Sequence, residues 1–215
     1  MPGMMRAGAF VRRNGAYGLG HVGWTFQYAD GSYCDGGVEN VAGTPISPPG
    51  QTGFWTERVV DPDIPMQLRA YDAFKLFEIE AGTPDQADKA VAWVATQPYL
   101  VIFRNCMDDT YDVLRSYGTP GLPLPLLEIT PNHWFDQLSP AAQPVTAQAM
   151  QAAGLLPSAR IESVRMAVKP AAEAPPWRTP GTPEWQALHE DLLRPTLTNR
   201  LSSLQPRLPD VPPGA

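Results

Sequence analysis

"YLVIFRNCMDDTYDVL", residues 99–114, joins an apolar run to a helical pattern and places a cysteine at the junction. Residues 99–103 are rich in aromatic and β-branched side chains, which predicts a short buried strand. Asn105 is a favoured N-cap and Gly118 a favoured C-cap, so the helix is expected to begin at Cys106 and to stop before Gly118. The N–H groups and the dipole at a helix start stabilise a thiolate. The junction therefore predicts either a reactive thiol or a small buried side chain.

The chain on both sides of this junction predicts an antiparallel sheet. Residues 21–40, "HVGWTFQYADGSYCDGGVEN", have two strand-like runs on either side of the Asp-Gly turn signal at residues 30–31. Residues 8–13 predict an edge strand, and the alternation in residues 73–80 predicts another strand. Residues 41–65 are rich in Pro and Gly and predict a long loop, which in compact domains is usually functional or disordered.

A second helix is predicted immediately before the apolar run. In "TPDQADKAVAWVATQ", residues 83–97, Thr83 is an expected N-cap, Pro84 fits the first helical position, and Gln86 completes a capping-box pattern. The expected fold class is therefore α+β, with an antiparallel sheet and the cysteine helix packed against it.

The composition changes near residue 140, after which about half of the 25 prolines lie. The compact domain is expected over residues 5–138. Residues 139–215 are expected to be a Pro-rich extension that adds little to the core, with helices over 139–154 and 182–197 and a disordered end.

Composition excludes several classes of function. The chain of 215 residues is 43% hydrophobic, which is enough for one domain with a core. A net charge of −6 without a Lys/Arg cluster argues against nucleic acid and anionic membranes as partners. No apolar run approaches the roughly 20 residues of a membrane span. The N-terminus lacks a Sec-type signal, so we expect a cytoplasmic protein or one exported without such a signal.

Two cysteines cannot form a disulfide framework or the usual cysteine-rich zinc site, so no metal or organic cofactor is expected. A nucleophilic cysteine instead needs a base within hydrogen-bond reach. Of three histidines, His189 lies in an ordinary exposed helical pattern, and His133 lies beside aromatics as a packing or capping residue. His21 lies on a predicted strand between Gly20 and Gly23, which leave room for another side chain or a substrate.

The two motifs together resemble a known superfamily. "GHVGWTFQYADGSYCDGG" is similar to the histidine hairpin of the NlpC-type superfamily, and "YLVIFRNCMDDTYDVLRSYGTPGLP" is similar to the cysteine element of its circularly permuted papain-like members. The relatives that it resembles are the lecithin–retinol acyltransferase-like proteins and the permuted papain-like isopeptidases (PPPDE). The resemblance covers about residues 15–125 and implies a permuted papain-like domain.

The resemblance also implies roles for individual residues. Cys106 becomes the nucleophile, with a backbone oxyanion site at its own N–H and that of Met107. His21 becomes the general base. The third polar group falls on the returning strand, at Asp35 or, with another strand register, at Glu39.

Further residues are expected close to the site. Trp55, in the long loop, and Asn105, beside the nucleophile, are expected to contact the substrate. Cys34 is expected in the core, facing away from Asp35, with a regulatory disulfide to Cys106 as the alternative.

One position departs from the family pattern. Asp109 stands where the relatives usually carry an aromatic residue, and together with Asp108 it places two negative charges in the first helical turn. These charges suit the helix dipole, but they also raise the pKa of the thiol.

The function expected from these residues is a thiol-dependent hydrolase of amide or isopeptide bonds, of the cysteine peptidase or amidase kind. The alternatives are an acyltransferase that uses Cys106 and His21, and a catalytically inactive interaction module whose Pro-rich extension contacts a protein partner. Asp108 and Asp109 favour the inactive module, whereas the presence of Cys106, His21 and Asp35 favours the enzyme.

Overall fold

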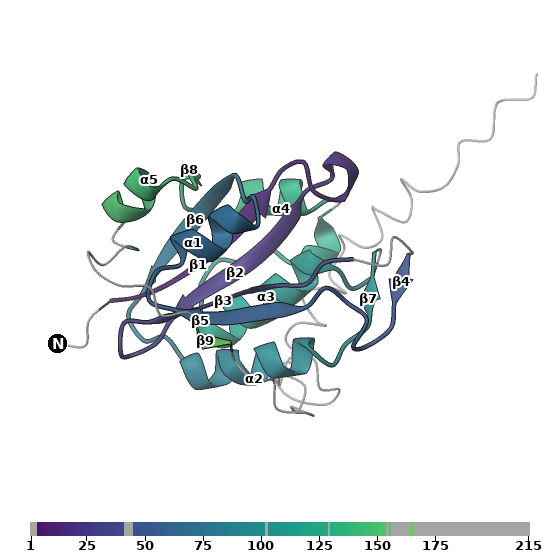
Figure 1. The fold of residues 1–215 in the computed structure, drawn as a ribbon, viewed down its shortest axis with the longest axis horizontal. Helices are drawn as coiled ribbons and strands as arrows, with labels where there is room; N and C mark the ends of the chain where they lie inside the picture. The colour runs from purple at the N-terminus through teal and green to yellow at the C-terminus, as the bar shows by residue number, and fades with distance from the viewer. Residues whose placement is uncertain are drawn as a thin grey trace, which may run out of the picture. The chain divides into compact units, whose positions relative to one another are not determined.

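The computed structural model describes residues 4–40, 45–101, 103–128, 130–153, 155 and 164–165. These residues form a mixed α+β fold around one antiparallel sheet (Figure 1). The strands of this sheet are, in spatial order, β8 (Gln143–Pro144), β6 (Ala73–Ile79), β1 (Met5–Arg12), β2 (His21–Gln27), β3 (Tyr33–Gly37), β5 (Trp55–Val59) and β9 (Val164–Arg165). A separate two-stranded ribbon pairs β4 (Ile46–Ser47) with β7 (Tyr99–Leu100).

Helices cover both faces of the sheet (Figure 1). One face, called here the α3 face, packs against α2 (Pro84–Val94), α3 (Cys106–Tyr117) and α4 (Pro131–Gln137). The opposite face, the α1 face, packs against α1 (Asp63–Leu68), the segment after it and α5 (Ala147–Ala152). Single 3-10 turns lie at Ala16–Gly18 and Pro125–Leu127.

Strand β2 lies at the centre of this arrangement and is buried on both sides. Its residues Val22, Trp24 and Phe26 belong to the core of the α3 face. Because side chains alternate along a strand, His21 and Gly23 belong to the α1 face. The predicted hairpin is confirmed: β2 and β3 are antiparallel neighbours on either side of the turn at residues 29–31.

Helix α3 begins and ends where its capping residues predict. The side chain of Asn105 accepts a hydrogen bond from the Met107 N–H at 2.9 Å, and Asp108 accepts one from the Asn105 N–H at 3.1 Å. Gly118 ends the helix with φ 96°, a conformation that favours glycine. The start of α2 is also confirmed, but without the capping box, because the Thr83 hydroxyl donates to Ser116 O instead.

The apolar run at residues 99–103 is not a buried strand of the main sheet. Only Tyr99 and Leu100 form a strand, and it pairs with β4. The backbones of Leu100 and Arg104 hydrogen-bond in both directions, so the chain turns back at once, and Phe103 is 76% exposed. A short apolar run without periodicity does not by itself define a strand, and the prediction of a strand over residues 99–103 was wrong for this reason.

Two further predictions about the sheet were wrong. The strand predicted at residues 8–13 is not at an edge, because β1 pairs with β2 on one side and β6 on the other. The predicted loop over residues 41–65 contains β5, which hydrogen-bonds to β3 in the main sheet.

The chain continues onto the sheet beyond residue 138, where the compact domain was expected to end. Strand β8 extends the sheet beside β6, and Met150 of α5 and Leu155 are completely buried in the core of the α1 face. The described residues belong to one unit, residues 1–173. The helix predicted over 182–197, with His189, and the predicted disordered end lie outside the described residues.

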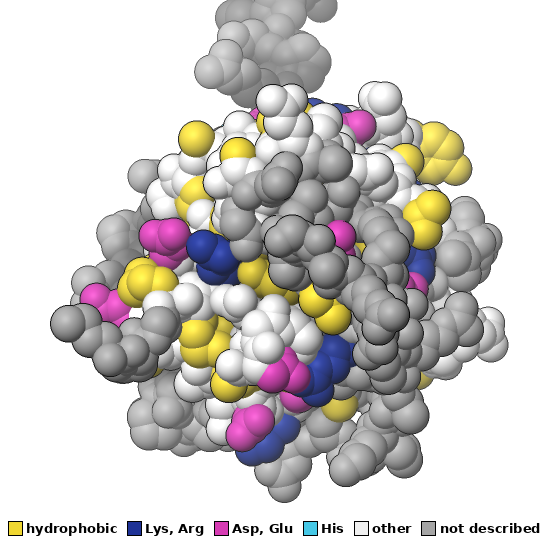
Figure 2. Space-filling model, turned by 60° about the vertical axis from the view of Figure 1, so that its left-hand side comes forward, with side chains coloured by type: hydrophobic (Ala, Val, Ile, Leu, Met, Phe, Trp, Pro, Cys, Tyr) yellow, Lys and Arg dark blue, Asp and Glu magenta, His cyan; other side chains and the backbone are white. Residues whose placement is uncertain are grey.

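The surface mixes charges of both signs. On the face in Figure 2, Lys and Arg side chains lie close to Asp and Glu side chains, with apolar groups between them. Exposed ion pairs such as Arg13–Asp136 and Arg58–Asp30 are of this kind. Among the helices that the structure describes, none is long and apolar enough to cross a membrane.

Candidate functional site

Cys106 is the first residue of α3 and is 1% exposed. Burial raises the pKa of its thiol to about 12, and the carboxylates of Asp109 and Asp108 add to that rise. Hydrogen bonds from the Val22 backbone N–H and the Tyr99 side chain lower the pKa of the thiol, so both groups lie close to the sulfur. Because the Val22 N–H belongs to the peptide bond that follows His21, the structure places the thiol beside the backbone of the predicted base.

His21 begins β2 and is 4% exposed. Burial lowers the pKa of its imidazole to about 4, the Glu39 carboxylate opposes that shift, and Arg12 and Arg69 add to it. The His21 Nε2 atom lies 3.8 Å from Glu39 Oε1, and Glu39 also pairs with Arg12 at 3.3 Å. At neutral pH the imidazole is therefore uncharged, with a carboxylate next to one of its nitrogens.

The structure brings Glu39, and not Asp35, to the imidazole. In the β2–β3 register, Gly23 is opposite Gly37 and Thr25 is opposite Asp35. Asp35 therefore lies four residues along the strand from His21, about 13 Å away. It is completely buried, and burial raises its pKa well above the usual range.

The two carboxylates in the first turn of α3 are both engaged in the fold. Asp108 closes the capping box, while Asp109 and Asp112 pair with Arg104. The Arg104 Nη2–Asp109 Oδ1 distance is 2.5 Å and the Arg104 Nη1–Asp112 Oδ2 distance is 3.4 Å. The Arg104 guanidinium also lies over the Trp93 ring, 4.2 Å from its centroid. We call Arg104, Asp109 and Asp112 the Arg104 cluster; it anchors the start of α3 and thereby positions Cys106.

Asn105 uses its polar atoms within the fold. Its Oδ1 atom accepts from the Met107 N–H, and its Nδ2 atom donates to Val101 O at 3.1 Å. The Met107 N–H, expected in an oxyanion site, is thus already bonded in this structure. Asn105 is placed to fix the helix start, and substrate contact by this residue stays a prediction.

Tyr71, which lies between α1 and β6, was not found from the sequence. Its ring centroid is 5.7 Å from that of His21. Burial raises the pKa of its hydroxyl well above the usual range, as do Glu39 and Cys106, which places the hydroxyl near both groups. The preceding residue, Ala70, has φ 56°. No pattern in the sequence around Tyr71 distinguishes it from an ordinary core tyrosine.

Trp55 lies on β5, opposite Gly37 of β3, and is 9% exposed. The Arg69 guanidinium covers its ring at 3.8 Å from the centroid. The sequence predicted Trp55 near the site, and the structure places it on the α1 face with Tyr71.

Cys34 and His133, the other cysteine and the other histidine that the structure describes, are accounted for by the fold. Cys34 is confirmed as a core residue of the α3 face: it is a free thiol, 3.3 Å from the Thr56 hydroxyl. Burial raises its pKa to about 12. His133 lies on the exposed side of α4 and pairs with Glu128.

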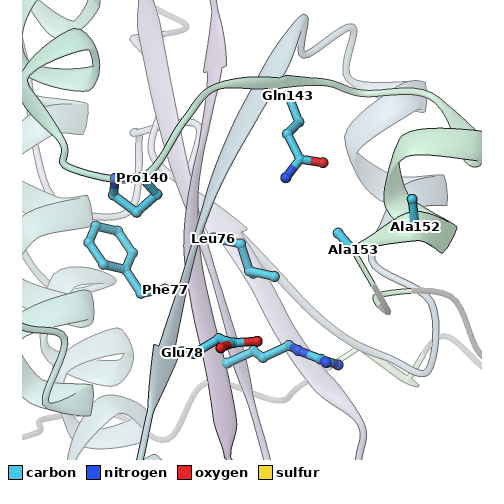
Figure 3. Close-up of a pocket in the computed structure, with 8 residues that line it drawn as sticks. Leu76, Phe77, Glu78, Pro140, Gln143, Ala152 and Ala153 are labelled. Atoms are coloured by element: carbon cyan, nitrogen blue, oxygen red, sulfur yellow. The ribbon is translucent and has the colours of Figure 1, made fainter.

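A pocket of about 540 Å³ lies away from these residues, at the β6 edge of the sheet. In Figure 3, Leu76 and Glu78 lie along β6, with Gln143 above them and Ala153 to their right, and all four line the pocket. None of the predicted site residues lines it. Among the described residues, no group of three or more His, Cys, Asp or Glu side chains is placed to hold a metal ion.

No family model, curated protein or solved structure matches this chain.

Proposed function

We propose that this protein is a thiol-dependent hydrolase of amide or isopeptide bonds, in which Cys106 is the nucleophile and His21 the general base. The observation that supports the proposal is the position of the Cys106 thiol beside the peptide bond that follows His21, the residue whose imidazole has the Glu39 carboxylate next to it. The chain order supports a permuted papain-like fold, because the histidine strand precedes the cysteine helix.

Glu39 replaces Asp35 as the proposed orienting group. A carboxylate at Nε2 favours the imidazole tautomer that carries its proton there, which leaves the Nδ1 lone pair for the thiol proton. The present 3.8 Å is longer than a hydrogen bond. As the imidazole becomes positively charged, attraction to Glu39 shortens this distance and stabilises the imidazolium.

The reaction starts from a neutral thiol and a neutral imidazole, since burial opposes both charges. The Cys106 sulfur attacks the amide carbonyl carbon while its proton passes to His21. The C–N bond then breaks, the amine leaves with the proton from His21, and a thioester remains on Cys106. Water, deprotonated by His21, hydrolyses this thioester and restores the thiol.

An activated ester tests the nucleophile directly. With p-nitrophenyl acetate, we expect a burst of nitrophenolate and an acetyl group on Cys106, detected by mass spectrometry. Cys106→Ala removes both signals, whereas Cys34→Ala, which changes the other buried thiol, retains them. A burst that survives Cys106→Ala would refute the proposal.

The same assay tests the orienting group. Glu39→Gln should slow acetylation by about 10-fold to 10⁴-fold. The upper limit is the effect of losing the orienting aspartate in a serine triad. Asp35→Asn should leave the rate unchanged, because Asp35 is paired in register with Thr25. The reverse result would restore Asp35 as the third residue.

A second candidate function has its own support. Cys106 is almost fully buried, and burial raises its thiol pKa to about 12, as in a structural cysteine. These two observations favour a non-catalytic interaction module. Absence of any acetyl-Cys106 with p-nitrophenyl acetate would select this alternative.

A further inference from the structure

Two of the buried hydrogen-bond donors on the α1 face that have no acceptor among the described residues lie over Gly37. They are the Trp55 indole Nε1 and the Tyr71 hydroxyl, which we call the donor pair. Both side chains are at least nine-tenths buried, with 9% and 4% of their surface exposed. Buried polar atoms are almost always partnered, because leaving one unpaired costs about 1–3 kcal/mol.

The two donors converge on one place. A Cβ atom added to Gly37 would lie 2.9 Å from Trp55 Nε1 and 3.1 Å from the Tyr71 hydroxyl. The donors are therefore no more than about 6 Å apart, and two donors that share one oxygen acceptor lie within about that separation. Gly23, the register partner of Gly37, also faces the Tyr71 hydroxyl, so no side chain of β2 or β3 separates the donors here.

Two matching residues on the α3 face are bonded. The Trp134 indole donates to Pro123 O at 2.9 Å, and the Tyr117 hydroxyl donates to Gln27 O at 2.7 Å. The Trp24 indole on the α3 face also has no acceptor among the described residues, but the three atoms nearest to a Cβ built on Gly36 all belong to Trp24. What distinguishes the α1 face is that two donors without acceptors meet over one glycine. The donor pair on the α1 face is left facing bare glycine backbone.

The surroundings of the donor pair are electrically balanced. Arg12 pairs with Glu39 at 3.3 Å, and Arg69 pairs with Glu57 at 3.5 Å. Two cations and two anions leave no excess charge to attract an ionic ligand. A neutral acceptor, such as an amide carbonyl oxygen, matches two neutral donors.

We propose that the donor pair binds a carbonyl oxygen of an amide substrate. This inference rests on the proposed hydrolase function and names the group by which the substrate is held. The Tyr71 ring lies beside the proposed base, with its centroid 5.7 Å from that of His21, and this contact connects the bound amide to the proposed site. Trp55 and Tyr71 are binding residues in this account, and His21 keeps its proton-transfer role.

The experiment uses the indole N–H resonances of the full chain in a ¹⁵N-labelled Cys106→Ala variant, titrated with N-methylacetamide. We expect a saturable shift of the Trp55 resonance, assigned by its loss in Trp55→Phe, in the millimolar range typical of a very small ligand. The Trp134 resonance is the internal control and stays unmoved. Tyr71→Phe should weaken binding about fivefold, the effect of removing one hydrogen bond.

A Trp55 resonance that does not move would overturn the proposal, as would an unchanged affinity in Tyr71→Phe. This test is separate from the ester assay because it needs no thiol. A saturable Trp55 shift without acetylation of Cys106 keeps the amide site and removes the hydrolase. Acetylation without the shift keeps the hydrolase and removes the amide site.

Discussion

The Arg104 cluster and the donor pair are both buried and polar, but they differ in whether their groups are partnered. In the Arg104 cluster, the two terminal guanidinium nitrogens contact the carboxylates of Asp109 and Asp112, and of the three guanidinium nitrogens only Nε lacks a hydrogen-bond partner in the described part of the chain. In the donor pair, Trp55 Nε1 and the Tyr71 hydroxyl have no acceptor among the described residues. Internal pairing holds a helix start in place, whereas we propose that the donor pair receives a ligand. Substitutions in the first should affect stability, and substitutions in the second should affect binding.

The largest expected effect is on the Arg104 cluster. Arg104→Met leaves Asp109 and Asp112, at 2% and 0% exposure, without their cation. We expect the free energy of unfolding, measured in urea, to fall by about 3–5 kcal/mol. Arg13→Met is the matched control: its pair with Asp136 is exposed, so its loss should cost about 1 kcal/mol or less. Equal losses in the two variants would show that the Arg104 cluster is not a structural anchor.

The next effect is the response of stability to pH through His21. Its pKa is about 4 in the folded protein against an ordinary 6.5, so only the unfolded chain takes up a proton between these values. The free energy of unfolding should therefore fall as the pH falls below 6.5, by about 2 kcal/mol at pH 5.

Urea unfolding at several pH values checks this sign. In His21→Gln the fall that is due to His21 should disappear, while the surface variant His133→Gln should keep it. An identical pH dependence in the wild type and in His21→Gln would mean that His21 titrates normally in the folded protein.

The smallest expected effect separates two buried tyrosines. Tyr117→Phe removes a hydroxyl that donates to Gln27 O and should lower the free energy of unfolding by about 1 kcal/mol. Tyr71→Phe removes a hydroxyl that has no acceptor in the described part of the chain, so it should leave stability unchanged or raise it. A loss in Tyr71→Phe as large as that in Tyr117→Phe would mean that the Tyr71 hydroxyl serves the fold.

Local chemistry explains which parts of the fold were predictable. Helix α3 was predicted because Asn105, Asp108 and Gly118 cap it through contacts within a few residues. The hairpin was predicted from its turn signal, but the identity of the residue that lies beside the His21 imidazole depends on the strand register. In the observed register the hairpin is symmetric about residue 30, and His21 and Glu39 are equally far from that residue along the chain. A symmetric count across the turn would therefore have favoured Glu39 over Asp35.

Other features depend on contacts between distant segments. Strand β5 was hidden in a Pro/Gly-rich stretch and is a strand because it pairs with β3. Met150 is buried because α5 packs on the α1 face, which the proline content after residue 140 did not indicate. The donor pair arises from a tyrosine after α1 and a tryptophan on β5 that meet over Gly37. Contacts between distant segments leave no pattern in the sequence of either segment.

Whether Cys106 is a nucleophile served by His21 is tested most directly against the other cysteine of the same chain. Burial raises the pKa of both Cys106 and Cys34 to about 12, and both are free thiols, so they are matched in acidity and exposure. Iodoacetamide labelling from neutral to alkaline pH, read by mass spectrometry of the two cysteine peptides, compares them in one sample. The account predicts faster labelling of Cys106 than of Cys34, with the excess lost in His21→Gln. Equal labelling rates in the wild-type protein would contradict it.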